Sequence, residues 1–202
     1  MKTITQIKQN KKDVLIVLNT NEILKISYEA YLSSYLYEGK ELSKEEIHKL
    51  QEISSYSKLL EYALSLLRKK FYTESEMKNK LLKKKASLCT SNKIISLLTE
   101  QSLISDEMYM NDLFEMYKEK NFGELKIKNE LRKKGFKESL IKKLKFNEKE
   151  QVLSCKISFE ECTKKIKEED SLKKKQKIFN KLTRLGFTNE VINKVMKIQE
   201  EY

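Results

Sequence analysis

The chain has 202 residues, of which 36% are charged and 39% hydrophobic, and it carries a formal charge of +12. This composition favours several small hydrophobic cores over one large core. The apolar runs are too short for a signal peptide or a membrane span, so secreted and membrane-embedded classes are excluded and a cytoplasmic protein is predicted. The chain has no proline and only four glycines, which predicts a mainly α fold.

Residues 1–57 are predicted to form a small leader domain with a β-hairpin or antiparallel sheet and helices. Three segments look extended, at 4–7, 13–18 and 23–28. Helical spacing then begins at Tyr28, with an apolar stripe of Tyr31, Leu32, Tyr35 and Leu36. Ser43 and Glu46 have the spacing of a capping box, so a second helix is expected to begin there.

A ten-residue pattern occurs three times in the rest of the chain. The copies begin at Met77, Ile127 and Ile178, with spacings of 50 and 51 residues. Each copy lies between two further segments with helical apolar spacing, so we predict tandem three-helix-bundle repeats in an elongated, curved array. The predicted boundaries of the three repeats are 58–104, 105–147 and 148–202.

The middle helix of two repeats is followed by a glycine and a phenylalanine. Gly135 and Gly186 stand where a helix would end, which predicts a left-handed C-cap. Lys85 and Ala86 occupy these positions in the first repeat, and the connection there is longer, so we expect a differently built corner. In the third repeat, the apolar stripe of the first helix is expected to continue toward Leu172.

The positive charge is concentrated in the repeats. Residues 1–57 hold 8 lysines and 8 acids, whereas residues 58–202 hold 34 basic and 22 acidic residues. Such a surface attracts the phosphates of nucleic acid, an acidic protein or an anionic membrane face. A lysine-rich proteome with solvated charges is the competing explanation.

The middle helix of the second repeat is predicted to have a basic face. At 100° per residue, Lys126 and Lys133 lie opposite the apolar stripe, while Lys128 and Arg132 share a flank. Lys134 lies closer to the stripe and would have to extend past it to reach water. The remaining candidate binding residues are Arg68, Lys69, Lys70, Lys83, Lys84, Lys177 and Arg184.

Three aromatic residues near predicted loops could stack on exposed bases or close small cores: Phe71, Tyr72 and Phe122. By contrast, Tyr31, Tyr35 and Tyr109 are assigned to packing.

Little in the sequence supports an enzyme. His48 is the only histidine, and no glycine-rich nucleotide loop is present. Three cysteines with no Cys-x-x-Cys pair argue against a disulfide framework or a zinc ribbon. Asp106 and Glu107 precede a predicted helix, where capping is the favoured role. We therefore expect no catalytic residue, cofactor or metal.

Several segments together resemble the RecX family, whose members are small regulators of the RecA recombinase. The similar segments are 36–42, 63–70, 73–77, 103–109 and 130–136, the last reading Glu-Leu-Arg-Lys-Lys-Gly-Phe. The chain departs from the family pattern at Lys70 and Phe71, where the family carries arginine and proline, and at 122–124, where the family carries Lys-Gly-Pro. Lysine lacks the forked guanidinium that grips a phosphate or carboxylate.

The resemblance implies a non-enzymatic negative regulator in DNA repair, recombination and the SOS response. A monomer is expected because an array of unequal repeats has no obvious need for symmetry. The regulator would lie along the groove of a RecA filament on single-stranded DNA and restrain filament extension, strand exchange, ATPase and coprotease activity. Its DNA contacts would be sequence-nonspecific, with double-stranded DNA as a further ligand. The alternatives are an autonomous helix-turn-helix-like DNA-binding protein and a structural helical-repeat adaptor.

Overall fold

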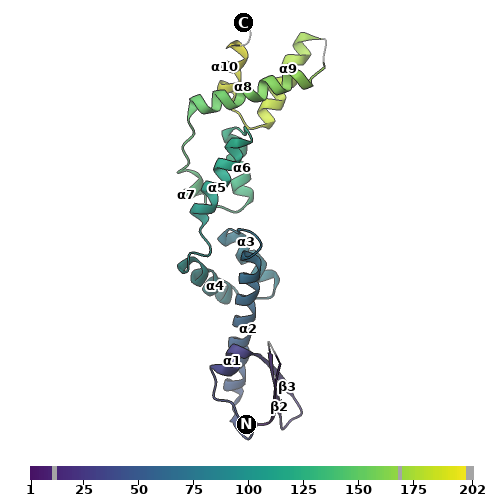
Figure 1. Ribbon diagram of the computed structural model, residues 1–202, viewed down its shortest axis with the longest axis vertical. Coiled ribbons are helices and arrows are strands. Elements are labelled where there is room, and N and C mark those ends of the chain that lie inside the picture. Colours follow the sequence, from purple (N-terminus) through teal and green to yellow (C-terminus); the bar gives the residue numbers. More distant parts are fainter. Residues whose placement is uncertain (11–12, 168–169, 199–202) are drawn as a thin grey trace. The chain divides into compact units, whose positions relative to one another are not determined.

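The computed structural model describes residues 1–10, 13–167 and 170–198 (Figure 1). These residues are mainly helical and begin with a small antiparallel sheet, as the sequence predicts. The chain forms two compact units. Unit 1 comprises Met1–Phe71 and Met77–Leu103, and unit 2 comprises Tyr72–Glu76 and Ile104–Tyr202. Among the described residues, no helix combines the length and apolar composition that a membrane span requires.

The leader in unit 1 is a four-stranded sheet covered by one long helix. Its elements are β1 (Lys2–Gln9), β2 (Asp13–Leu18), β3 (Ile23–Ser27), α1 (Tyr28–Leu32), β4 (Glu41–Leu42) and α2 (Lys44–Leu67). The antiparallel strands have the order β3-β2-β1-β4. Alternating strand residues such as Val14, Ile16 and Ile26 form a core with Leu50 of α2, because successive side chains of a strand point to opposite faces.

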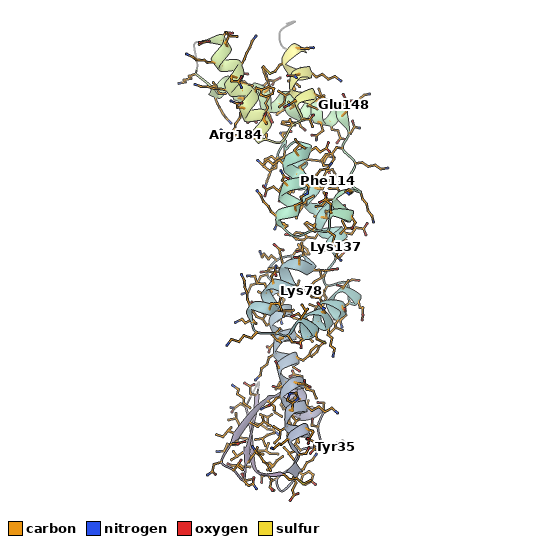
Figure 2. The ribbon with its side chains drawn as sticks, turned by 180° about the vertical axis from the view of Figure 1, so that it is seen from behind. Tyr35, Lys78, Phe114, Lys137, Glu148 and Arg184 are labelled. Atoms are coloured by element: carbon orange, nitrogen blue, oxygen red, sulfur yellow. The ribbon has the colours of Figure 1, made fainter. Side chains whose placement is uncertain are left out.

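The predicted helical stripe after Tyr28 is wrong beyond residue 32. α1 ends at Leu32, and the backbone N–H of Ser33 donates to the carbonyls of Glu29 and Tyr31. Because the chain leaves the helix there, helical spacing no longer places later residues on one face. Tyr35 is 93% exposed and takes no part in packing, contrary to its assignment from the sequence (Figure 2).

α2 begins with the predicted capping box. The Glu46 backbone N–H donates to Ser43 Oγ at 3.1 Å, and the Ser43 backbone N–H donates to the Glu46 carboxylate at 2.8 Å. However, α2 continues without a break from Lys44 to Leu67, so the two helices expected on either side of residue 57 are one. The leader and the first repeat therefore share a helix, and the division of the chain into four domains stays a prediction.

Three helices belong to each repeat, with α2 supplying the first helix of repeat 1. The others are α3 (Glu74–Lys83), α4 (Leu88–Glu100), α5 (Asp106–Glu119), α6 (Glu124–Lys133), α7 (Glu138–Ile141), α8 (Glu148–Lys165), α9 (Ser171–Arg184) and α10 (Asn189–Ile198). Repeat 2 buries Ile127, Leu131 and Phe136 in one core, whereas repeat 3 has a second core around Ile178 and Phe187. Unit 2 is thus built from separate small cores.

Two predicted helices of unit 2 are shorter than expected. The apolar spacing of Leu140, Ile141 and Leu144 predicts a helix that continues through Leu144, but α7 is a single turn that ends at Ile141. α8 ends at Lys165, and Ile166 is extended. The apolar stripe of α8 therefore stops before Leu172, which lies in α9 and is 77% exposed.

The corners after α3, α6 and α9 have the same backbone geometry. The left-handed φ angles are 63° at Lys85, 82° at Gly135 and 86° at Gly186. The next backbone N–H donates five residues back in all three corners, at 3.2 Å from Ala86, 3.3 Å from Phe136 and 3.3 Å from Phe187. The expectation that the first corner differs is wrong, because an exposed lysine tolerates this conformation at a modest cost.

We expect Lys85→Gly to raise the free energy of unfolding of unit 1. Relief of the left-handed strain contributes about 1–2 kcal/mol, and the greater freedom of glycine in the unfolded chain offsets about 0.5–1 kcal/mol of this. Urea denaturation of the full chain measures the change. Lys84→Gly is the control, because Lys84 has no positive φ angle and should lose stability. A loss of stability in Lys85→Gly would contradict this account.

Within unit 2, each corner closes onto the start of the preceding middle helix. At the start of α6, the Gly123 N–H donates to the Leu185 carbonyl at 2.8 Å, and the Leu125 N–H donates to the Gly186 carbonyl at 3.0 Å. At the start of α3, Thr73 Oγ1 donates to the Lys134 carbonyl at 2.9 Å. We call these contacts repeat joints. At the α6 joint, helix-end carbonyls accept from helix-start N–H groups, which otherwise lack partners, whereas at the α3 joint the donor is a side-chain hydroxyl.

Each joint also contains a cap supplied by the next repeat. Asp106 Oδ1 of α5 accepts from the Glu74 N–H at 2.9 Å, and Gln151 Oε1 of α8 accepts from the Glu124 N–H at 3.0 Å. Ser105 caps α5 itself, so Asp106 does cap a helix, but the helix is α3. Sequence position near a helix start did not reveal which helix the carboxylate would serve.

We expect Asp106→Ala to lower the free energy of unfolding by about 1–2 kcal/mol, because a buried helix-start N–H loses its acceptor. Asp106→Asn keeps that oxygen and should retain stability at neutral pH. Burial raises the pKa of the Asp106 carboxyl despite the opposing hydrogen bond from Glu74. The folded state therefore binds the proton more tightly than the unfolded state, and its stability falls as the pH rises through the folded pKa.

Thermal unfolding at neutral pH and at about pH 4 tests this sign. The natural chain should gain stability relative to Asp106→Asn as the pH falls. An unchanged difference between the two proteins would show that burial of the carboxylate has no energetic consequence.

Candidate basic interface

A groove in unit 2 is built by the joint between α6 and α9. The Gly186 corner lies so close to α6 that a Cβ added to Gly186 would come within 2.3 Å of the Lys126 backbone N. This approach sets the last turn of α9 beside the exposed side of α6. The groove is lined by Leu125, Lys126, Asn129, Glu130, Arg132, Lys133, Thr183, Arg184 and Gly186. We call it the basic groove.

The basic groove unites four predicted site residues from two repeats. Lys126, Arg132 and Lys133 come from α6. Arg184, which is labelled in Figure 2, comes from the end of α9. These four cations and Glu130, the one carboxylate in the lining, give the basic groove a net formal charge of +3. Repeat spacing gives Lys133 and Arg184 equivalent positions in their repeats, but only the joint places Arg184 beside the cations of α6.

Lys126 and Arg184 are the cations best placed to bind an anion. Within the described ranges, neither forms an ion pair with a carboxylate. The Lys126 ammonium lies 3.6 Å from the centroid of the Phe122 ring, an attraction that orients it without neutralising its charge. Phe122 in turn stacks on Tyr117 at 5.8 Å between centroids, so packing and not base stacking accounts for this ring.

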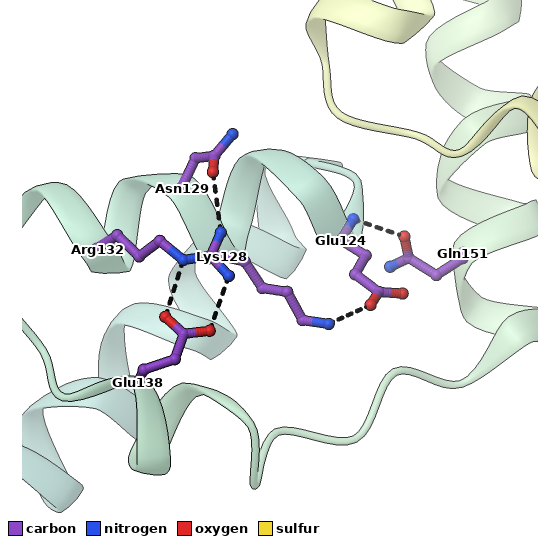
Figure 3. A network of polar contacts seen from close by, with 6 residues as sticks. All are labelled: Glu124, Lys128, Asn129, Arg132, Glu138 and Gln151. Carbon is purple, nitrogen blue, oxygen red and sulfur yellow. Dashed lines mark hydrogen bonds and ion pairs between the residues drawn. The ribbon is translucent and has the colours of Figure 1, made fainter.

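The other cations of α6 have acidic partners that the sequence analysis did not identify. Arg132 donates to both carboxylate oxygens of Glu138 at 2.9 Å and to Asn129 Oδ1 at 3.0 Å (Figure 3). Lys133 pairs with Glu130 at 2.8 Å. These hydrogen bonds between Arg132 and Glu138 raise the pKa of Arg132 and lower the pKa of Glu138.

Two predicted site residues of α6 lie outside the basic groove. Lys128 pairs with Glu124 one turn earlier (Figure 3). Its ammonium is 5.2 Å from the centroid of the Phe146 ring. Lys134 is half-buried at the α3 joint, where its ammonium donates to the Tyr109 hydroxyl at 3.2 Å. Burial lowers the pKa of Lys134, but Tyr109 and Glu76 outweigh it and raise the pKa overall.

The remaining candidate residues are exposed but do not line the basic groove. Lys177 lies on α9. Those of unit 1 are Arg68, Lys69, Lys70, Lys83 and Lys84. Among the aromatic candidates, Tyr72 is buried at 8% exposure, whereas Phe71 is 65% exposed. Tyr72 therefore packs, and Phe71 stays a candidate for stacking.

Two of the acidic partners of the α6 cations could have been predicted from their spacing in the sequence. Glu124 precedes Lys128 by four residues and Glu130 precedes Lys133 by three, which are the separations of neighbours on a helix surface. Glu138 lies beyond the α6 corner, so no helical periodicity relates it to Arg132. The Glu138 contact depends on how the chain turns back after Gly135.

The described residues offer binding chemistry and no recognisable catalytic constellation. His48 has a side chain that is 72% exposed, and no group of three or more potential metal ligands is found in the described ranges. All three cysteines are free, and burial raises the pKa of Cys155 to about 12. A thiol with so high a pKa is protonated and unreactive at neutral pH.

Comparison with known proteins identified relatives along nearly the whole chain, although no protein-family model matches it. A protein named Regulatory protein RecX from Clostridium tetani is 32% identical over 181 residues, covering 88% of this chain and 82% of the relative. One of the same name from Clostridium beijerinckii is 29% identical over 200 residues, covering 94% and 91%.

Two solved structures share the fold. A crystal structure of regulatory protein RecX has a TM-score of 0.76 at 22% identity and covers 98% of this chain and 100% of its own. The crystal structure of RecX from Lactobacillus salivarius has a TM-score of 0.66 at 22% identity and covers 73% and 98%.

Proposed function

The chain belongs to the RecX family of regulatory proteins, and from this premise we propose that it is a negative regulator of the RecA recombinase. It binds along the groove of the RecA filament on single-stranded DNA, in the cytoplasm, and acts in DNA repair, recombination and the SOS response. By occupying the filament as a monomer, it restrains filament extension, strand exchange, ATPase activity and coprotease activity. No step requires chemistry by this chain.

The observation that carries this proposal is the basic groove. Lys126 and Arg184 come from different repeats, line one groove and lack carboxylate partners within the described ranges. Two such cations can contact successive phosphates of a nucleic-acid strand or acidic side chains on a protein filament. Contact through several charges makes binding both tight and salt-sensitive.

The paired cations can also contribute. Arg132 and Lys133 are exposed, and an exposed ion pair contributes only about 0–1 kcal/mol. A phosphate can therefore replace Glu138 or Glu130 as the partner at little cost. The forked guanidinium of Arg132 already binds two carboxylate oxygens, and it matches a phosphate in the same way.

The test compares the full chain on three ligands over a salt series: naked single-stranded DNA, double-stranded DNA and RecA filaments. We expect the filament to bind most tightly, and RecA ATP turnover to fall as the filament is occupied. Equal affinity for naked DNA without inhibition would favour an autonomous helix-turn-helix-like DNA-binding protein. Absence of binding to all three ligands would favour a structural adaptor.

A further inference from the structure

Repeat 1 lacks a pair of aromatic rings that repeat 2 has. In repeat 2, the rings of Tyr109 and Phe136 lie 5.7 Å apart. Fifty residues earlier, at the same positions of the repeat, the chain carries Leu59 and Ala86. The corner backbone is the same in both repeats, so Ala86 occupies the place of Phe136 with only a methyl group.

An open groove lies at this place in unit 1, between α2 and α4. It is lined by Glu52, Ile53, Ser55, Tyr56, Leu59, Lys85, Ala86, Ser87, Cys89, Thr90 and Lys93. Its apolar part is made by Ile53, Tyr56, Leu59 and Ala86, of which Leu59 and Ala86 are each 9% exposed. In repeats 2 and 3 the equivalent corner residue is a phenylalanine that is 5% or 1% exposed. The same corner backbone therefore accommodates a buried ring in the other two repeats.

The lining of the groove carries a net positive charge, and the lysines that provide it come from the corner after α3 and from α4. Lys85 and Lys93 line it, with Glu52 as the one lining carboxylate. The segment Met77–Leu103 contains six lysines and one glutamate. An occupant with negative charges next to its apolar anchor would be attracted to this surface, whereas a basic occupant would be repelled.

We propose that this α2–α4 groove is a docking site for an acidic protein segment that inserts one aromatic side chain over Ala86. The inserted ring takes the place that Phe136 and Phe187 fill in the other repeats, while flanking carboxylates pair with Lys85 and Lys93. A ring buried in an apolar pocket and surrounded by charges is the usual anchor of a peptide-binding site. This site is separate from the basic groove and does not depend on the proposed function.

An amino-acid ring fits the groove better than a nucleobase does. A base has polar edges that need hydrogen-bond partners when buried. Ser87 is already committed, because its Oγ accepts from the Thr90 N–H at 3.0 Å and donates to Thr90 Oγ1 at 2.9 Å. A phenylalanine ring has no polar atoms, so it needs no hydrogen-bond partner when it is buried.

The test uses a fluorescein-labelled peptide with one phenylalanine flanked on each side by three glutamates, and measures its binding to the full chain by fluorescence anisotropy. Replacing the phenylalanine by alanine should weaken binding at least about tenfold. Ala86→Phe supplies the ring internally and should also weaken binding at least about tenfold. Lys93→Glu changes only an exposed side chain and should weaken binding about fivefold.

Circular dichroism and thermal unfolding establish that each variant is folded, and Lys93→Glu keeps the test decisive if Ala86→Phe does not fold. Leu82→Phe, which adds a ring at an exposed position outside the groove, should bind as the natural chain does. No measurable binding of the peptide, or equal binding of the alanine peptide, would overturn the proposal. It would be overturned as well if oligothymidylate bound instead and Ala86→Phe abolished that binding.

Discussion

Gly186→Ala is expected to lower the free energy of unfolding of unit 2 by about 3–4 kcal/mol. The left-handed backbone at Gly186, with φ of 86°, contributes about 1–2 kcal/mol of this once a Cβ is present. The new methyl group would also lie 2.3 Å from the backbone N and the Cβ of Lys126. Because backbone atoms cannot move aside alone, α6 and the α9 corner must separate.

Separation breaks the two backbone hydrogen bonds of this joint, from Gly123 to Leu185 and from Leu125 to Gly186. Each contributes about 1 kcal/mol. Hydrogen exchange at the amides of Gly123 and Leu125 reports on the joint directly and should become faster in the variant. Urea denaturation of the full chain measures the overall loss.

Gly39→Ala is the matched control. Gly39 has a similar φ of 93°, but nothing lies within 4 Å of an added Cβ. It should therefore show only the backbone cost, and exchange at Gly123 and Leu125 should be unaffected. If Gly186→Ala were no more damaging than Gly39→Ala, the close approach of the two repeats would not be required for the fold.

The triple variant Lys126→Ala, Lys133→Ala and Arg184→Ala is expected to weaken binding to the RecA filament about 100-fold at low salt. Three charge contacts at about 1 kcal/mol each give roughly this factor. For contacts with single-stranded phosphates, the slope of log affinity against log salt should become shallower by about 2, since each contact contributes about 0.7. Inhibition of RecA ATP turnover should be lost with the affinity.

A control with the same change in charge is Lys143→Ala, Lys145→Ala and Lys156→Ala. All three residues are exposed in unit 2 and lie outside the basic groove. This control should keep most of the affinity. Circular dichroism should show that both triple variants are folded, because none of the six side chains is buried. Equal losses in the two variants would mean that total charge, and not the basic groove, determines binding.

The α6 surface shows which contacts could be predicted from the sequence and which could not. Helical periodicity correctly put Lys126 and Lys133 on the exposed side of α6. It did not show that Arg132 is held by Glu138, because the corner at Gly135 interrupts the periodicity between them. The predicted uniformly basic face is in fact a face of ion pairs with Lys126 left unpaired among the described residues.

The corners after the middle helices also differ from what the sequence predicted. A glycine before a phenylalanine identified two of them, but the backbone at Lys85 is the same without glycine. The glycines are needed for a further reason, since a Cβ at Gly135 would meet Ser75 and one at Gly186 would meet Lys126. That requirement concerns a neighbouring repeat, so residue preferences within one helix could not reveal it.

The sequence by itself determined the helical class, the leader sheet, the three copies of the middle helix and the capped ends of the second and third copies. These features depend on contacts a few residues apart, which apolar spacing and capping residues encode. The tertiary structure alone decided that α2 is one helix, that Asp106 caps α3, and that Arg184 joins Lys126 in one groove. The contacts of Asp106 and Arg184 join residues 32 or more positions apart, where no local period relates one side chain to the other.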